Sequence, residues 1–205
     1  MQVYKLVLGE LQTNCYVLEL AEKQCVVFDI GEGEPVLLRF LEREQLKPLG
    51  ILLTHGHYDH IAGVEAVRKK YDVPVYIHTA DVPMLTDRRA NLGEWLSEKP
   101  FQPVQVWQTV EDGMTLSFGS MNLRVLHTPG HTKGSVCYVG ADLLFTGDTL
   151  FRLSRGRTDF PGGSDREMLE SFQKLASLSD DYHVYPGHGE TSTLAYEKAH
   201  NPNFE

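Results

Sequence analysis

The chain has little cysteine and no long apolar run. Its three cysteines, Cys15, Cys25 and Cys137, lie inside apolar, strand-like segments. An odd number without paired spacing indicates buried, reduced thiols rather than disulfides or a zinc ribbon. No apolar run is long enough to cross a membrane, and residues 1–6 lack the basic segment and apolar core of a secretory signal. We therefore expect a soluble, cytoplasmic protein with no membrane partner.

Basic residues are also scarce. Lysine and arginine number 19 against 28 aspartates and glutamates, which gives a formal net charge of -9. Phosphate contacts need a basic face, so this charge disfavours a nucleic-acid partner. The sequence has no low-complexity tract and no linker-like stretch, and its 41% apolar and 23% charged residues are ordinary globular values. Its 205 residues predict one compact domain over 1–205.

Apolar periodicity predicts alternating strands and helices. Strands are expected over residues 3–8, 15–20, 25–29, 50–54, 75–77, 115–118, 121–127, 135–139, 142–146 and 183–186. Helices are expected over residues 35–46, 61–71, 166–178 and 192–200. Residues 79–103 are predicted to be irregular or weakly helical. A segment of that length in a compact domain is typical of a lid or a wall of a binding site.

The stretch from Thr54 to His60 carries the strongest chemical signal. It places His55, His57, Asp59 and His60 directly after an apolar run. Imidazole and carboxylate are the usual ligands of zinc and non-haem iron, and a site that keeps water as a further ligand can run hydrolysis. His55 and His57 share one side of an extended segment, while the turn into the next helix aims the other two residues differently. We interpret the stretch as half of a two-metal site; the alternative is a polar loop that caps a helix.

Other apolar strands also lead to a residue that can bind metal. His131 follows Pro129-Gly130, Asp148 follows Gly147, and His188 follows Pro186-Gly187. Ligands gathered at one sheet edge from separated parts of a chain are how a rigid scaffold builds a site. Asp29 also ends a strand, and two interpretations stay open for it: a carboxylate that braces the metal loop, or the start of a turn.

Together these motifs, His55-x-His57-x-Asp59-His60 with His131, Asp148 and His188, resemble the metallo-β-lactamase superfamily. Within it the chain is most similar to the glyoxalase II group, the hydroxyacylglutathione hydrolases, over nearly its whole length. The resemblance implies an α/β fold, an αββα sandwich of two mixed β-sheets flanked by helices. It implies that one metal ion is held by His55, His57 and His131, that a second is held by Asp59, His60 and His188, and that Asp148 bridges them, with Asp59 and Asp148 catalytic.

The implied chemistry is hydrolysis of a small-molecule thioester such as S-lactoylglutathione. Two divalent ions, with zinc favoured over iron and manganese, can share a water, lower its pKa towards about 7 and present hydroxide to the carbonyl carbon. An aspartate at position 148 resembles this hydrolase branch rather than the lactamases that have a cysteine ligand there. Oligomeric state and native metal are left open, because histidine and carboxylate suit several metals.

Substrate recognition is less clearly marked. Arg157 matches the position of a lysine with which glyoxalase II enzymes hold glutathione, and Asp159 stands where they have a tyrosine. A solvated loop is the equal alternative for this basic segment. Larger members of the family continue into a helical domain, whereas 17 residues follow His188 here. We therefore expect weaker recognition of glutathione.

Three other functions compete with this prediction. They are a persulfide dioxygenase with one iron in a two-histidine, one-aspartate triad, a non-catalytic metal-binding module, and a nuclease, which the net charge disfavours. The remaining histidines are expected to be structural or solvated: His78, His127, His183 and His200. Three aromatic residues near the motifs are expected in the core rather than in the pocket wall: Tyr16, Phe151 and Phe160.

Overall fold

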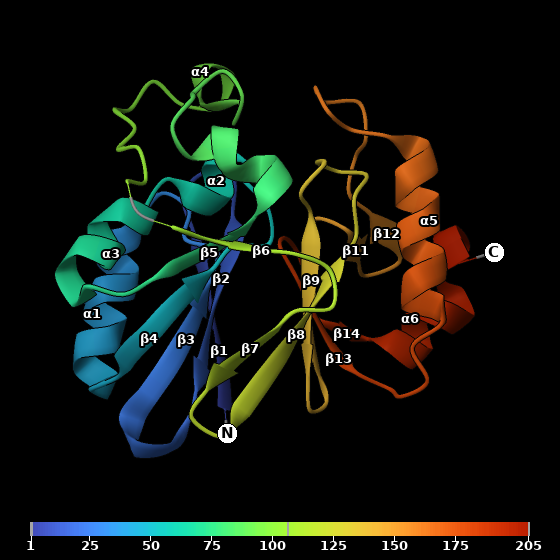
Figure 1. Ribbon diagram of the computed structural model, residues 1–205, viewed down its shortest axis with the longest axis horizontal. Helices are drawn as coiled ribbons and strands as arrows, with labels where there is room; N and C mark the ends of the chain where they lie inside the picture. Colours follow the sequence, from blue (N-terminus) through green and yellow to red (C-terminus); the bar gives the residue numbers. More distant parts are fainter. Residues whose placement is uncertain (1, 106, 205) are drawn as a thin grey trace.

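The computed structural model describes residues 2–105 and 107–204. Two six-stranded sheets lie face to face, with helices on the outer side of each (Figure 1). The strand order is β1-β2-β3-β4-β5-β6 in the first sheet and β14-β13-β10-β9-β8-β7 in the second. Both sheets contain parallel and antiparallel pairs. The predicted αββα sandwich with two mixed sheets is confirmed.

Each half of the chain builds one sheet. The first contains β1 Gln2–Leu8, β2 Thr13–Glu19, β3 Gln24–Phe28, β4 Lys47–Leu52, β5 Val75–His78 and β6 Gln108–Val110. The second contains β7 Thr115–Phe118, β8 Met121–His127, β9 Val136–Gly140, β10 Leu143–Gly147, β13 His183–Pro186 and β14 Ser192–Thr193. A small hairpin pairs β11 Leu150–Phe151 with β12 Ser154–Arg155. The loops after β4, β8, β10 and β13 therefore come from both halves.

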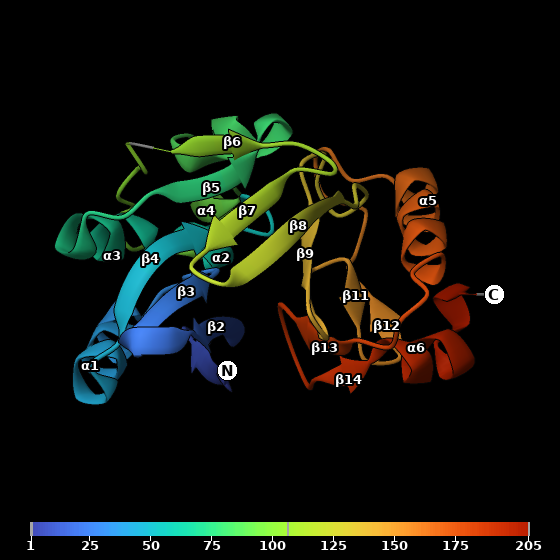
Figure 2. The ribbon, with the colours of Figure 1, turned by 60° about the horizontal axis from the view of Figure 1, so that its bottom comes forward.

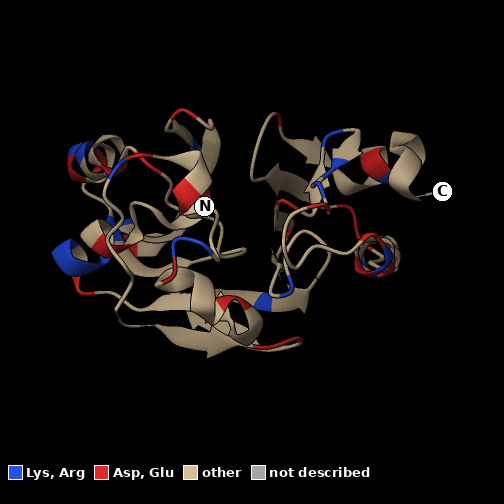
Figure 3. Cartoon of the chain, turned by 90° about the horizontal axis from the view of Figure 1, so that it is seen from above, with Lys and Arg blue, Asp and Glu red and all other residues tan. Residues whose placement is uncertain are grey.

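The helices form the outer layers (Figure 2). On the first sheet lie α1 Glu34–Glu44 and α3 Val64–Tyr71, and beside the second lie α5 Asp165–Ala176 and α6 Leu194–His200. The shorter helical segments are α2 Tyr58–Ile61 and α4 Gly93–Leu96, with 3-10 turns at Ala21–Lys23, Thr79–Leu85 and Pro202–Phe204. Seen from above, the helices of the two halves lie on opposite sides, and residues of both charge signs are interspersed along them (Figure 3).

The helix α5 illustrates how sequence pattern becomes packing. Ser164 caps its first turn, because the hydroxyl accepts a hydrogen bond from the backbone N–H of Glu167. Met168, Phe172 and Leu175 recur at helical spacing and are buried against the second sheet. The cap contributes about 1 kcal/mol, and burial of each apolar side chain contributes about 2 kcal/mol more. Gly130 packs directly on this helix at Met168, which places the loop of His131.

Aromatic packing joins the two sheets. The ring of Phe28 stacks on that of Phe145 with centroids 3.8 Å apart and planes 11° apart. Tyr138 of the second sheet donates its hydroxyl to the Leu53 carbonyl of the first at 2.9 Å. Because Leu53 directly precedes the histidine-rich stretch, this interior core holds the ends of strands from both sheets in fixed relation.

Several boundaries differ from the prediction. The helix expected over 61–71 is divided, because the chain bends at Ala62 and Gly63 between α2 and α3. A Cβ at Gly63 would lie 2.6 Å from the Gly31 carbonyl oxygen, so the close packing of this bend on Gly31 needs glycine. Ser192–Thr193 forms strand β14 rather than the start of the last helix. The sequence missed β6, β11 and β12, which are too short to carry a period of two.

The cysteines are buried and unpaired, as predicted. Within the described ranges, the helices lack the combination of length and apolarity that a bilayer crossing needs.

Candidate metal centre

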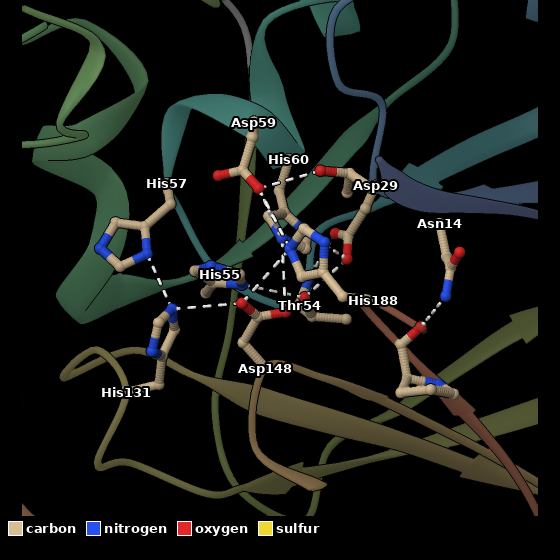
Figure 4. A network of polar contacts seen from close by, with 12 residues as sticks. Asn14, Asp29, Thr54, His55, His57, Asp59, His60, His131, Asp148 and His188 are labelled. Carbon is tan, nitrogen blue, oxygen red and sulfur yellow. Dashed lines mark hydrogen bonds and ion pairs between the residues drawn. The ribbon is translucent and has the colours of Figure 1, made fainter. Parts of the chain in front are cut away.

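The seven predicted metal ligands lie together at one end of the sandwich (Figure 4). The first sheet supplies four of them from the loop after β4 and from α2, and the second sheet supplies three from the loops after β8, β10 and β13. The seven are His55, His57, Asp59, His60, His131, Asp148 and His188. Side chains from both halves of the chain thus meet at this end of the sandwich.

Asp148 lies between the two ends of this cluster. One of its oxygens, Oδ1, is 3.4 Å from His60 Nε2, and the other, Oδ2, is 3.5 Å from His131 Nε2. On one side His57 Nδ1 approaches His131 Nε2 at 2.9 Å. On the other side the Asp59 carboxylate lies 3.2 Å from His188 Nε2. Asp148 Oδ2 is also 3.6 Å from His188 Nε2, so this carboxylate lies within reach of both ends and is placed as a bridge.

The ligand atoms fall into three overlapping groups whose members lie within 4.8 Å of one another: His55, His57 and His131; His55, His60 and Asp148; and Asp59, His60 and His188. The first and last groups share no residue. The arrangement can therefore hold two cations.

The donor atoms themselves fit a cation. Four buried atoms of the cluster have no hydrogen-bond partner: His55 Nε2, His57 Nε2, His60 Nε2 and Asp148 Oδ1. Buried polar atoms are normally paired, because an unpaired one costs about 1–3 kcal/mol. Imidazole nitrogen and carboxylate oxygen are the donors that zinc, iron and manganese accept. A metal centre accounts for the three atoms that face it, His55 Nε2, His60 Nε2 and Asp148 Oδ1, whereas His57 turns its Nδ1 toward the centre and its Nε2 away (Figure 4).

The outer nitrogens of three histidine rings are held by the surrounding chain. His60 Nδ1 contacts Asp29 Oδ2 at 2.9 Å, His131 Nδ1 contacts the Arg157 carbonyl at 2.7 Å, and His55 Nδ1 contacts Thr54 Oγ1 at 3.1 Å. Such partners set the tautomer and orientation of a metal-binding imidazole. They leave each Nε2 towards the centre.

Asp29 combines both of the roles left open by the sequence. Its φ of 47° is left-handed, a conformation that aspartate tolerates in turns. Its carboxylate accepts from the Thr54 backbone N–H at 2.8 Å and from Thr54 Oγ1 at 2.7 Å, besides contacting His60. Asp29 thus turns the chain and braces the metal loop.

We expect Asp29→Asn to weaken the centre without unfolding the chain. Asparagine also tolerates the left-handed conformation, but its amide replaces one accepting oxygen by a donor that faces other donors. Removing partners of this kind typically lowers metal affinity or activity by about 10- to 100-fold. Metal titration and circular dichroism test this, with Asp142→Asn at an exposed turn as control. Unchanged metal affinity would contradict the bracing role.

Asp81 is a structural residue of the centre that the sequence did not reveal. Its buried carboxylate accepts from Gly56 N at 3.0 Å, Thr132 Oγ1 at 2.7 Å and Gly134 N at 2.8 Å. Burial raises its pKa, although these donors favour the charged form. Asp81 thereby ties the loop of His57 to the loop of His131. It lies in a segment without periodicity, so no sequence signal singled it out.

Two glycines allow the loops to approach this closely. A Cβ at Gly187 would collide with Asp148 Oδ1, and a Cβ at Gly147 would collide with Thr54 Oγ1. Gly147 also has a φ of +47°, which disfavours other residues. The loops that carry Asp148 and His188 can therefore take these positions only with glycine at both sites.

Negative charge gathers on one side of the centre. Burial lowers the pKa of His57 to about 3. Burial also acts to lower the pKa of His60, but the carboxylates of Asp59, Asp148 and Asp29 overcome it and raise that pKa to about 10. The carboxylate side thus attracts positive charge even without a metal ion.

A cavity of about 470 Å³ opens over the centre. The segment 79–103, predicted as a lid or wall, contributes Leu92 and Leu96 to its lining. Phe151 and Phe160 also line it, so their assignment to the core was wrong. Both belong to the segment after Asp148, which is too short and irregular for periodicity to show which way a side chain points. Tyr16 is buried between the sheets as expected, and its hydroxyl donates to the Pro186 carbonyl.

The remaining predicted residues lie around this pocket. Arg157 lines the cavity, and its guanidinium pairs with Asp159. The histidines assigned structural roles lie elsewhere: His78 stacks on His127 with centroids 4.1 Å apart, and His183 and His200 are exposed.

The fold and the histidine–aspartate cluster define a class of metal-dependent proteins. The chain belongs to the metallo-beta-lactamase superfamily, whose family model matches residues 8–188. This membership indicates a metallo-hydrolase, and it confirms the resemblance at the level of the superfamily.

Among curated relatives, the "Probable metallo-hydrolase YqgX" of Bacillus subtilis is 36% identical, over 95% of this chain and 93% of that protein. The hydroxyacylglutathione hydrolase GloC of Haemophilus influenzae is 30% identical, over 93% and 92%.

Solved structures of similar proteins include three with different descriptions. The BLEG-1 B3 metallo-beta-lactamase superposes with a TM-score of 0.91 at 41% identity, over 98% of both chains. The protein TTHA1623, in a di-iron-bound form, gives 0.86 at 38%, over 97% of this chain and 98% of the other. ETHE1 from Myxococcus xanthus gives 0.79 at 28%, over 98% and 84%.

Proposed function

We propose that the protein is a dinuclear metal-dependent hydrolase that cleaves small-molecule thioesters such as S-lactoylglutathione. The observation that carries this proposal is the position of Asp148 among the clustered histidines, with the inward-facing Nε2 atoms of His55 and His60 left without partners. The similarity to GloC supports a thioester substrate. The net charge of -9 supports a small-molecule partner over nucleic acid. We also propose that residues 1–205 act as a single domain.

The ligand assignment follows the groups in space. His55, His57 and His131 would hold one ion, Asp59, His60 and His188 would hold the other, and Asp148 would contact both. Zinc is our first choice of metal, and iron is the alternative that the di-iron form of TTHA1623 supports. Divalent cations bound here supply Lewis acidity and make water acidic enough to react near neutral pH.

The protein's own residues would then position the reactants. Asp59 and Asp148 are the carboxylates that line the cavity at its floor, where each can accept a hydrogen bond from the attacking water. Thr13 donates to Asp59 Oδ2 at 2.9 Å and fixes that carboxylate. The cavity wall of Leu92, Leu96 and Phe160 excludes bulk water from the acyl group. Addition of water to the carbonyl carbon and cleavage of the C–S bond release a carboxylate, a thiol and one proton.

A thiol-release assay on metal-analysed protein tests this function. Protein purified without added metal should contain two ions per chain and should release thiol from S-lactoylglutathione and from simpler thioesters. Protein that binds two ions but cleaves none of these thioesters would overturn the proposal. The exposed-site variant Asp142→Asn, with its substitution far from the cavity, is the matched control for protein quality.

Two similar structures each favour a second candidate. The likeness to a B3 metallo-beta-lactamase favours hydrolysis of a β-lactam amide. The likeness to ETHE1 is compatible with the mononuclear iron dioxygenase that the sequence left as an alternative. Metal content and oxygen uptake separate the dioxygenase from both hydrolases. Nitrocefin turnover in the same preparation separates the lactamase from the thioesterase.

A further inference from the structure

The cavity over the metal centre has an apolar wall that carries two arginines. Leu11, Leu92, Leu96, Phe151 and Phe160 supply the apolar lining, and Arg155 and Arg157 supply the cationic groups. With about 470 Å³, it has the size of a small-molecule site. Arginines that line a cavity beside a reaction centre would ordinarily bind an anionic part of a substrate.

Both arginines are already paired with carboxylates of the same loop region. Arg157 donates from Nε and Nη2 to the two oxygens of Asp159, each at 2.6 Å. Arg155 donates from Nη2 to Asp165 Oδ1 at 2.9 Å, whereas its buried Nη1 has no partner. The Arg157 guanidinium also lies over the ring of Phe160, 4.1 Å from its centroid. The two N–H donors of Arg157 that could bind a substrate carboxylate in a bidentate manner are thus already bonded to Asp159.

The neighbouring chamber carries charge of the opposite sign to these arginines. It has a volume of about 540 Å³ and shares Leu11, Asp59 and Leu96 with the cavity. Four glutamates and one lysine line it, and Lys99 is itself paired with Glu32 at 2.6 Å. A substrate that extends from the metal centre into this chamber meets carboxylates, which repel an anionic group.

We propose that Asp159 is a specificity-determining residue: by occupying the Arg157 guanidinium, it withholds that cation from substrate carboxylates, so that the enzyme prefers thioesters with an uncharged thiol half. This inference rests on the proposed thioesterase function. Anionic substrates are disfavoured because they must displace an internal carboxylate before they can bind Arg157.

The expected size of the effect follows from exposure. The side chains of Arg157 and Asp159 are 58% and 66% exposed, so solvent screens the pair. For a pair this exposed we expect at most about a fivefold change in kcat/KM.

Two thioesters with the same lactoyl group provide the test. S-Lactoylglutathione carries two carboxylates, and the lactoyl thioester of N-acetylcysteamine is uncharged. The metal-loaded wild type should prefer the uncharged thioester, and Asp159→Asn should raise the ratio of kcat/KM for the charged over the uncharged substrate about fivefold. The gain should disappear in the double variant Arg157→Gln/Asp159→Asn and in about 1 M salt, where the Debye length falls to about 3 Å.

The outcomes separate the two proposals. Asp142→Asn, which removes an exposed carboxylate far from the cavity, should leave the ratio at its wild-type value. A wild-type preference for the glutathione thioester, or an unmoved ratio in Asp159→Asn, would overturn the role of Asp159 and leave the thioesterase intact. Failure of wild-type protein with two bound ions to cleave either substrate would overturn the proposed function, and the present inference with it.

Discussion

Asp148→Ala is expected to lower kcat/KM for thioester hydrolysis by at least about a thousandfold, because metal-ion catalysis supplies several kcal/mol and each 1.36 kcal/mol is tenfold. Its carboxylate lies within 3.6 Å of His60, His131 and His188, at both ends of the cluster, so alanine removes a potential ligand from both at once. The variant should also contain less than two ions per chain. Steady-state kinetics and elemental analysis of the same preparation measure both effects.

The control removes a carboxylate of the same type from the surface. Asp142 lies in the exposed turn between β9 and β10, and Asp142→Ala should keep wild-type metal content and turnover. His55→Ala should behave like Asp148→Ala, because His55 belongs to two of the three ligand groups. Near-normal turnover by either ligand variant with metal absent would refute the metal-dependent scheme.

Chelation of the wild-type protein is expected to abolish activity and to lower the melting temperature on the order of 10 °C. A ligand present at about 1,000 times its Kd stabilises the native state by about 4 kcal/mol, and 1 kcal/mol corresponds to about 2–4 °C for a chain of this size. Here the ions would join residues from both sheets, so their loss should destabilise the contact between the halves. Scanning calorimetry before and after dialysis against a chelator measures the shift.

Re-addition of metal and the ligand variant provide the controls. Zinc, iron or manganese added back singly should restore both activity and melting temperature, and the metal that restores most identifies the preferred ion. Asp148→Ala should show a smaller shift on chelation, because it has less metal to lose. Full activity in rigorously demetallated protein would contradict the expected result.

The centre was predictable because its ligands are chemically distinctive and follow strands. His55 and His57 directly follow an apolar run, and Asp148 and His188 each follow a strand and a glycine. The carboxyl ends of the parallel strands β10 and β13 meet at one edge of the sheet. Residues that directly follow these two strands are therefore expected to lie close together. The two-sheet architecture was predicted from the resemblance to the superfamily, and the periodicity of the sequence did not indicate it.

What the sequence missed depends on contacts between distant segments. Asp81 has no neighbour in sequence that marks it, yet it joins Gly56 to Thr132, two positions that are 76 residues apart in the sequence. The pairing of Arg157 with Asp159 depends on side-chain rotamers that residue types alone do not define. The metal-binding and substrate roles of the named residues, the cytoplasmic location and the single-domain organisation stay predictions.

The connection between β6 and β7 has an open glycine turn, where a Cβ at Gly113 would meet nothing within 4 Å. A chain cut at this turn yields two fragments that each hold one complete sheet. Neither fragment retains a full set of ligands, because four come from the first and three from the second. Reassembly of the fragments would then become a cation-dependent association, governed by the same residues to which we assign the chemistry of the intact chain.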